Sequence, residues 1–225
     1  MTERPVSSAL TKRRSIRAFR PDPVDRDIVA RLLTAARTAP SGANLQPGRF
    51  IALAGAALSD FTERLCAEIE AGRPPVSEYS YFPQPMPPAL KERQRAAGYA
   101  LYESLGVARR DVAGRKAQFL LNYRFFSAPV GIVITIRRDM GKGCFMDLGM
   151  SLMALMMAAE DEGLATCGIG ALANYGDLAG ALLNIPGEEL VVCGVALGYP
   201  DPDAPVNRVR TARDDLDVFA EFRGF

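Results

Sequence analysis

The hydrophobic positions along the chain follow two different spacings, which predict a mixture of helices and strands. Apolar side chains recur every three or four positions in five segments that we expect to be helical: residues 25–37, 58–71, 89–105, 112–125 and 216–222. Short apolar runs predict strands at residues 49–54, 130–137 and 190–197. Residues 146–162 are apolar on almost every side, and this pattern predicts a central buried helix that ends at Gly163.

The order of these elements indicates an α+β fold, because strands and helices are mixed without regular β-α-β alternation. Residues 73–88 are rich in Pro, Tyr and Phe, and they predict an irregular loop. The sequence shows no internal repeat and no linker-like segment. We therefore expect residues 1–225 to form a single domain, which is long enough to bury a sizeable core.

The net charge and the length of the apolar runs indicate whether the chain binds nucleic acid or a membrane. The chain has 27 Lys and Arg against 26 Asp and Glu, a formal net charge of +1. This balance offers no general basic surface, so we expect no nucleic-acid partner. The longest apolar runs, residues 128–136 and 148–159, are too short to cross a bilayer, so we expect no membrane partner. The four cysteines are widely spaced without a CxxC pair, which favours a reduced, cytoplasmic protein.

The chain contains no histidine. This absence excludes a Ser-His-Asp triad, a histidine general base and any metal site that uses histidine, and we expect no metal. An enzyme of this composition that works near neutral pH would therefore take its reactive group from a cofactor.

Two arginine clusters lie at opposite ends of this nearly neutral chain. Their members are Arg13, Arg14 and Arg17, which surround Ser15, and Arg208, Arg210 and Arg213 near the C-terminus. The guanidinium group is a rigid fork of donors that matches phosphate oxygens. The two clusters suggest one bound phosphorylated cofactor, whereas the alternative is a solvated basic loop and an exposed C-terminal tail.

Two further segments have the composition of ligand-binding loops. Residues 40–47, P-S-G-A-N-L-Q-P, form either a plain turn or a rigid polar loop facing a ligand. Residues 168–173 match the dinucleotide pattern G-x-G-x-x-[GA], but that pattern must follow a strand. Only residues 163–167 separate it from the predicted helix, so we reject the dinucleotide interpretation. We prefer the use of glycine where backbone approaches a flat ligand closely.

Five motifs occur in order over nearly the whole chain. They are R-R-S-I-R-A-F (13–19), P-S-G-A-N-L-Q-P (40–47), A-P-V-G-I (128–132), G-L-A-T-C (163–167) and C-G-V-A-L-G-Y with N-R-V-R-T-A-R (193–213). In this order they resemble the FMN-dependent nitroreductase family. The ending F-R-G-F (222–225) is most similar to the subgroup of nitrobenzoate and nitroaromatic reductases.

The resemblance implies a nitroreductase-like fold, with a central, mostly antiparallel sheet flanked by helices in an intertwined homodimer that binds FMN at the subunit interface. It also implies an oxidoreductase that takes hydride from NADPH or NADH and reduces nitroaromatic or quinone acceptors by a ping-pong mechanism, with a small aromatic molecule as substrate. Relative to shorter members of the family, residues 73–110 form a lid-like insertion.

Three other functions remain open. The first is reductive dehalogenation on the same fold, in which Glu78, Tyr81 and Lys91 of the insertion would clamp an amino-acid substrate. The second is flavin fragmentation on the same fold. The third, from another class, is a nucleic-acid binder with a basic arm, which the net charge of +1 disfavours.

The resemblance assigns cofactor-binding roles to individual residues. The phosphate would be held by Arg13 and Arg210, with Arg14 and Arg208 in the same clusters, and Ser15 would contact the phosphate and ribityl region. Arg17 would lie beside N1 and C2=O of the flavin, and Asn122 at the pyrimidine edge. Gly168, Ile169 and Gly170 would pass beside N5, so Arg17 and Gly170 are the expected catalytic residues. Ser41 and Asn44, in a loop with Pro40 and Gly42, would come from the partner subunit.

Two departures from the family pattern concern the space around the flavin. Gly48 replaces the usual aromatic residue after Q-P, and Gly168-Ile169 replace the Pro-Gln of the subgroup. We expect both changes to enlarge or loosen that space. The aromatic and Met residues of the insertion either wall a pocket over the flavin or anchor a surface excursion: Tyr79, Tyr81, Phe82, Met86, Tyr99 and Tyr102.

Overall fold

Four strands form one antiparallel sheet in the computed structural model, which describes residues 5–225. The strands are β1 (Arg49–Ala54), β2 (Val130–Arg137), β3 (Ala165–Ile169) and β4 (Glu189–Gly198), in the order β1-β2-β4-β3. In the register, Ala54 faces Val130 across β1 and β2, and Val130 faces Leu197 across β2 and β4. The predicted α+β fold with an antiparallel sheet is confirmed. The first four residues of the predicted 1–225 domain lie outside the described residues.

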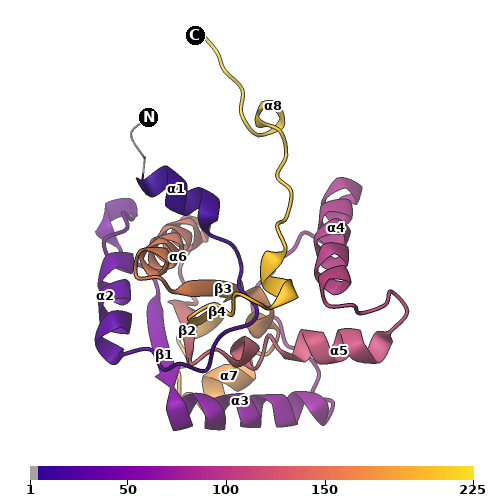
Figure 1. The fold of residues 1–225 in the computed structure, drawn as a ribbon. Helices are drawn as coiled ribbons and strands as arrows, with labels where there is room; N and C mark the ends of the chain where they lie inside the picture. The colour runs from indigo at the N-terminus through magenta and orange to yellow at the C-terminus, as the bar shows by residue number, and fades with distance from the viewer. Residues whose placement is uncertain (1–4) are drawn as a thin grey trace.

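The two central strands are buried because helices cover both faces of the sheet (Figure 1). The helices are α1 (Pro5–Lys12), α2 (Arg26–Ala36), α3 (Gly55–Glu70), α4 (Pro88–Ser104), α5 (Val112–Leu120), α6 (Lys142–Asp161), α7 (Gly176–Leu182) and α8 (Leu216–Phe219). Side chains of β2 alternate between the two faces: Val133 joins the cluster with α3 and α7, whereas Ile132 and Ile134 join the cluster with α2 and α6.

Most of the predicted elements occur within a few residues of their expected bounds. Helix α2 begins after Asp25, whose carboxylate accepts a hydrogen bond from the Asp27 N–H at 2.6 Å. The predicted helix over 112–125 is too long. It ends at Leu120, and Phe125 and Phe126 adopt positive φ values of 49° and 54° that a right-handed helix cannot accommodate.

Helices α1 and α7 and strand β3 were not predicted. Strand β3 overlaps the glycine-rich segment and pairs with β4 from Ala165 to Ile169. One reason for rejecting the dinucleotide motif was therefore wrong, because a strand does occupy this position. The rejection itself stands: β3 is antiparallel to β4 and Gly168 lies inside the strand, so no β-α-β unit is formed.

Helix α6 differs from the predicted central buried helix. It ends before Gly163, which has φ +70°, but in the single chain Met146 is 69% exposed and Met150 37% exposed. By length and composition alone, α6 is also apolar enough to cross a membrane, whereas the sequence runs were judged too short. In the structure it packs against α2 and β3 and carries the buried Asp147. One face of α6 is thus buried in the fold and another remains apolar and exposed.

Two parts of the chain stand away from the sheet in Figure 1. Helix α4 projects to one side, followed by α5, and a loop connects it to α3. The last segment, which contains α8, runs away from the body and leaves Phe219 86% exposed.

Candidate active site

The two arginine clusters meet in one cavity of about 300 Å³, called here the arginine cavity. Its lining comes from the end of α1, the segment that follows it and the segment after residue 208: Leu10, Thr11, Arg13, Arg14, Ser15, Arg17, Val209, Arg210, Thr211 and Arg213. The structure thus brings both ends of the chain together. Arg208 is exposed and lies outside this lining.

A single buried side chain, Asn207, ties the two segments to each other. Its Oδ1 accepts hydrogen bonds from the N–H groups of Arg17 (2.8 Å) and Ala18 (3.2 Å). Its Nδ2 donates to the carbonyl oxygens of Ala18 (2.7 Å) and Asp201 (2.9 Å). All four hydrogen-bonding positions of the amide are used, so Asn207 fixes the N-terminal arginines beside the C-terminal ones.

Strand β3 continues this site toward the centre of the sheet. The Ile16 N–H donates to the Thr166 carbonyl oxygen at 3.0 Å, and Ser15 pairs with Thr166 as an isolated parallel bridge. Burial raises the pKa of the Cys167 thiol, with Arg17 and the Ser15 hydroxyl acting in the opposite direction. These contacts place Ser15 and Arg17 directly beside β3.

The arginine cavity carries uncompensated positive charge. Among residues 5–225, none of its five arginines forms an ion pair with a carboxylate. The Nε of Arg14 is buried without a hydrogen-bond partner. Glu160 of α6 is the nearby acid, and its pKa is raised because burial outweighs the opposing effect of Arg13 and Arg14. A concentration of unpaired guanidinium groups fits a phosphate, which supplies several acceptor oxygens.

A larger cavity of about 870 Å³ opens beyond the end of β3 and is called here the aromatic cavity. Its lining residues are Ser77, Tyr79, Ser80, Tyr81, Phe82, Gln84, Gln94, Phe119, Gly170, Ala171 and Asn174. Tyr79, Tyr81 and Phe82 of the insertion therefore wall a pocket. Met86, Tyr99 and Tyr102 do not line it, and Tyr99 and Tyr102 instead lie under the guanidinium groups of Arg109 and Arg115.

The three glycine-segment residues face different surroundings. Gly168 is exposed in the middle of β3, and a Cβ there would meet only the end of Met156 at 3.3 Å. The Ile169 side chain is buried in the core. Gly170 borders the aromatic cavity, where the ring of Tyr81 packs directly on its backbone. The exposed backbone at Gly168 leaves room for a flat ligand to lie against it, whereas Tyr81 covers Gly170.

The contact between Gly170 and Tyr81 gives a first prediction. A Cβ at position 170 would lie 2.9 Å from Tyr81 Cε2. Because Tyr81 is 59% exposed, its ring can move, so Gly170→Ala should change the unfolding free energy by less than about 1 kcal/mol. The displaced ring should raise the KM for an aromatic acceptor several-fold, as measured by steady-state kinetics. In a Tyr81→Ala background the same change should have no further effect on KM; an equal effect there would contradict the contact.

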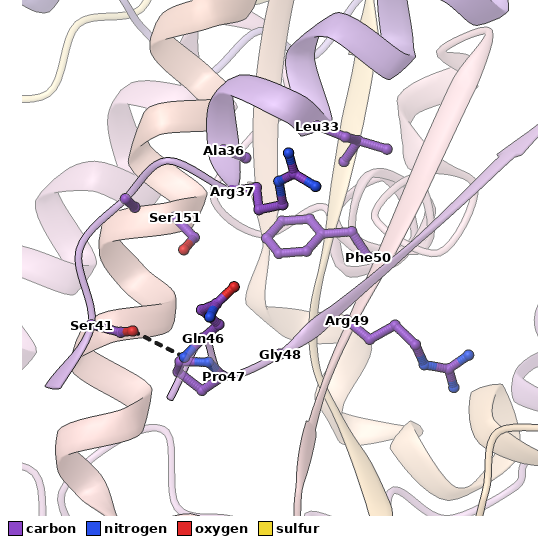
Figure 2. Close-up of a pocket in the computed structure, with 11 residues that line it drawn as sticks. Leu33, Ala36, Arg37, Ser41, Gln46, Pro47, Gly48, Arg49, Phe50 and Ser151 are labelled. Atoms are coloured by element: carbon purple, nitrogen blue, oxygen red, sulfur yellow. Dashed lines mark hydrogen bonds between the residues drawn. The ribbon is translucent and has the colours of Figure 1, made fainter. Parts of the chain in front are cut away.

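The polar loop of residues 40–47 lies elsewhere, against α6 (Figure 2). Ser41 Oγ accepts a hydrogen bond from the Gln46 N–H at 2.9 Å, drawn as the dashed line in Figure 2. The Gly42 N–H donates to Oδ2 of Asp147 at 3.0 Å. Pro40, Gly42 and Asn44 are exposed. In the single chain, residues 5–225, no residue of this loop lines the arginine cavity.

Gly48 is packed closely on the side that faces the sheet, and its expected effect on the space around the flavin stays a prediction. It has φ +95°, and a Cβ there would lie 2.4 Å from Cδ1 of Leu148 and 3.2 Å from the Thr135 carbonyl oxygen. The space toward the sheet is therefore filled by Leu148 of α6, although Gly48 also borders the 230 Å³ cavity in Figure 2.

This crowding gives a second prediction. Gly48→Ala should lower the free energy of unfolding by about 2–4 kcal/mol, because it combines overpacking with a left-handed backbone position. Urea denaturation measures the loss. Gly98→Ala, where nothing lies within 4 Å in helix α4, is the control and should not destabilise the protein. Equal stability of the two variants would show that Leu148 moves away at no cost.

Two important residues were not assigned a role from the sequence, and the flavin contact of Asn122 stays a prediction. Asn207 lies in the motif N-R-V-R-T-A-R, and Asp147 lies in the segment that predicts an apolar helix. A lone buried Asp in such a helix indicates a specific contact. The Nδ2 of Asn122 donates to the Phe119 carbonyl oxygen at 2.8 Å. Asn122 lines neither the arginine cavity nor the aromatic cavity.

Comparison with known proteins shows which family has this sequence and this fold. The sequence profile described as "Nitroreductase family" matches residues 10–199, which span both the arginine cavity's N-terminal side and the whole sheet. This chain belongs to the nitroreductase family. The described fold, with its antiparallel sheet and flanking helices, is the nitroreductase-like fold that the sequence motifs implied.

Several members of the nitroreductase family resemble the chain over almost its full length. A 4-nitrobenzoate reductase from Pseudomonas putida is 33% identical over 97% of this chain and 95% of its own length. A nitrobenzene nitroreductase from Ectopseudomonas oleovorans is 32% identical over 96% of each. The solved structure of an FMN and NADPH-dependent nitroreductase NfnB from Sphigopyxis sp. strain HMH is 39% identical, with a TM-score of 0.95 over 98% of this chain and 99% of that one.

Proposed function

We propose that this member of the nitroreductase family is an FMN-dependent oxidoreductase that takes hydride from NADPH or NADH and reduces nitroaromatic or quinone acceptors. The observation that carries the proposal is the arginine cavity, whose arginines have no carboxylate partner among residues 5–225. Ser15 of this cavity pairs with Thr166 of β3, the strand in which the backbone of Gly168 is exposed. The relatives that match this chain over almost their full length are named as nitroreductases or as a nitrobenzoate reductase, and these names support the same activity.

The residues of the arginine cavity would hold the phosphate end of FMN. Arg13, Arg14 and Arg210 would donate to its oxygens, and Ser15 would contact the adjoining region. The exposed face of β3 at Gly168 would accept the flat ring, with Gly170 at its far end. When bound, FMN supplies the hydride-transfer chemistry, which explains how a chain without histidine could catalyse a reduction.

Arg17 would act as an electrostatic catalytic residue. Its backbone is fixed by Asn207, and its guanidinium lines the arginine cavity and lies near Cys167 of β3. A preorganised cation at this position favours the accumulation of negative charge on a reduced cofactor more than it favours the neutral oxidised form. We therefore assign Arg17 to redox tuning as well as to binding.

The active unit would be an intertwined homodimer. The exposed methionines of α6 and the extended C-terminal segment with Phe219, Phe222 and Phe225 form apolar surface that a second copy of the chain can cover. The loop with Pro40, Ser41, Gly42 and Asn44 would then reach the cofactor of the partner subunit. Docking of this loop on Asp147 supports a rigid presentation of those groups.

Residues 73–110 would act as a lid on a single domain, with the small aromatic substrate in the aromatic cavity. A cytoplasmic location is supported by the free state of all four cysteines.

The alternative of reductive dehalogenation has no support from the proposed clamp. Glu78 is paired with Arg138 at 2.6 Å and lines a different cavity, and Lys91 does not line the aromatic cavity.

Anaerobic stopped-flow absorbance tests the proposed function. NADPH or NADH should bleach the flavin of the purified protein, and nitrobenzene or a quinone, added afterwards, should restore its colour. If the nucleotide bleaches the flavin but neither acceptor restores its colour, the proposed class of acceptor is contradicted. Failure of both nucleotides to bleach bound flavin would contradict the proposed electron donor.

A further inference from the structure

We propose that the aromatic cavity selects nitroarenes without a negative charge and discriminates against those that carry a carboxylate. The inference rests on the proposed function and names the substrate class of that site. The relatives do not decide this point, because a 4-nitrobenzoate reductase and a nitrobenzene nitroreductase are 33% and 32% identical to the chain.

Among residues 5–225, the lining of the aromatic cavity contains no Lys or Arg that could pair with a carboxylate. Its four rings are Tyr79, Tyr81, Phe82 and Phe119, and its other polar side chains are the amides and hydroxyls of glutamine, asparagine and serine. Tyr79 donates its hydroxyl hydrogen to the Val192 carbonyl oxygen at 2.6 Å, and burial raises its pKa above the ordinary value. The walls therefore stay neutral at physiological pH.

Three charged residues of the insertion and its neighbourhood, Glu78, Arg109 and Arg115, are engaged outside this cavity. Glu78 pairs with Arg138 on the other side of the loop. The guanidinium groups of Arg109 and Arg115 lie 5.1 and 4.8 Å from the ring centroids of tyrosines on α4. These cations stack on rings that do not line the aromatic cavity. Four arginines of the arginine cavity are assigned to the cofactor, three to its phosphate and Arg17 to redox tuning, so they are not available to the substrate.

The free energy of binding in such a cavity favours a neutral substrate over a charged one. A carboxylate that leaves water without a counter-ion loses its hydration and gains no compensating charge. A neutral nitroarene can pack between the rings in edge or offset geometry, as Tyr81 and Phe82 already do at a centroid distance of 4.8 Å. Its nitro oxygens can accept hydrogen bonds from the amides of Gln84, Gln94 or Asn174.

A pair of substrates of almost equal shape tests the proposal on the FMN-loaded enzyme. At pH 7.5, kcat/KM for 4-nitrobenzamide should exceed that for 4-nitrobenzoate by at least about tenfold, mainly through KM. Equal values for the two substrates, or a preference for 4-nitrobenzoate, would overturn the proposal.

A charge introduced into the lining provides the matched variant. Gln94 reaches the cavity from α4, so Gln94→Arg should lower the amide-to-carboxylate ratio by about tenfold through a new ion pair. Gln94→Met keeps a similar length without charge and should leave the ratio unchanged. Comparing ratios between variants cancels the different intrinsic reactivities of the two substrates. An unchanged ratio in Gln94→Arg would show that the substituent does not enter this cavity.

Dead-end ligands separate this proposal from the proposed function. Benzamide and benzoate can be titrated against the flavin absorbance without turnover, and benzamide should bind at least about tenfold more tightly. If neither nitroarene is reduced while benzamide still binds preferentially, the acceptor class is wrong and the neutral selectivity stands. If benzoate binds as well as benzamide, the selectivity is wrong whatever the acceptor.

Discussion

Protein carrying both Arg13→Ala and Arg210→Ala is expected to purify without bound flavin. Both guanidinium groups line the arginine cavity, and neither is neutralised by a carboxylate in the part of the chain that the structure describes. Charge-assisted hydrogen bonds contribute roughly 1.5–3 kcal/mol each, so the loss of two should weaken FMN binding by about 10²–10⁴-fold. Absorbance of the purified variant and titration with FMN measure this loss.

A matched control removes two arginines that are already paired outside the cavity. Arg20 pairs with Asp22 and Arg223 with Glu221, so Arg20→Ala with Arg223→Ala should retain the flavin. Full flavin occupancy in the Arg13→Ala and Arg210→Ala protein would contradict the assignment of the arginine cavity. Equal loss in the control would show that net charge, and not the cavity, determines retention.

Asn207→Ala is expected to reduce both stability and flavin affinity. The side chain is 3% exposed and makes four hydrogen bonds that join the Arg17 and Asp201 segments. Leaving buried backbone groups unpaired should lower the free energy of unfolding of the flavin-free protein by about 2–4 kcal/mol. The two arginine clusters should then no longer be held together, and FMN affinity should fall.

Urea denaturation of flavin-free proteins separates the effect of Asn207 from that of the arginines. The Arg13→Ala and Arg210→Ala protein should lose FMN with little change in the midpoint of unfolding. Asn207→Ala should shift the midpoint and weaken FMN binding together. A normal midpoint for Asn207→Ala would contradict its role in joining the two ends of the chain.

The parts of the fold that the sequence predicted are those in which one pattern dominates. Strands β2 and β4 have apolar runs that only a covered sheet can bury, and β1 is a short, partly exposed apolar run at the sheet edge. Helix α2 combines an Asp cap with a regular apolar face. Strand β3 was missed because it is short and contains Gly168 in a glycine-rich segment, and because its pairing with β4 is a long-range contact. The left-handed φ values at Phe125 and Phe126, which end the predicted helix, likewise depend on burial of both rings.

The candidate site was predictable where a residue type itself indicates the chemistry. Arginine clusters imply an anion, and they could be connected before their distance was known. The orienting residues could not be found in this way, because Asn207 acts through four backbone contacts that local sequence does not encode. The close packing at Gly48 could not be predicted for a similar reason, since Leu148 belongs to a helix that is distant in the sequence.

The most direct test of the account compares the affinity of the flavin-free protein for FMN and for riboflavin by calorimetric titration. The two ligands share the same ring and differ by the phosphate that the arginine cavity is proposed to hold. We predict that FMN binds at least about 100-fold more tightly, as expected for loss of two charge-assisted hydrogen bonds. Equal affinities, or failure of FMN to bind, would contradict the assignment of Arg13, Arg14 and Arg210 to a flavin phosphate.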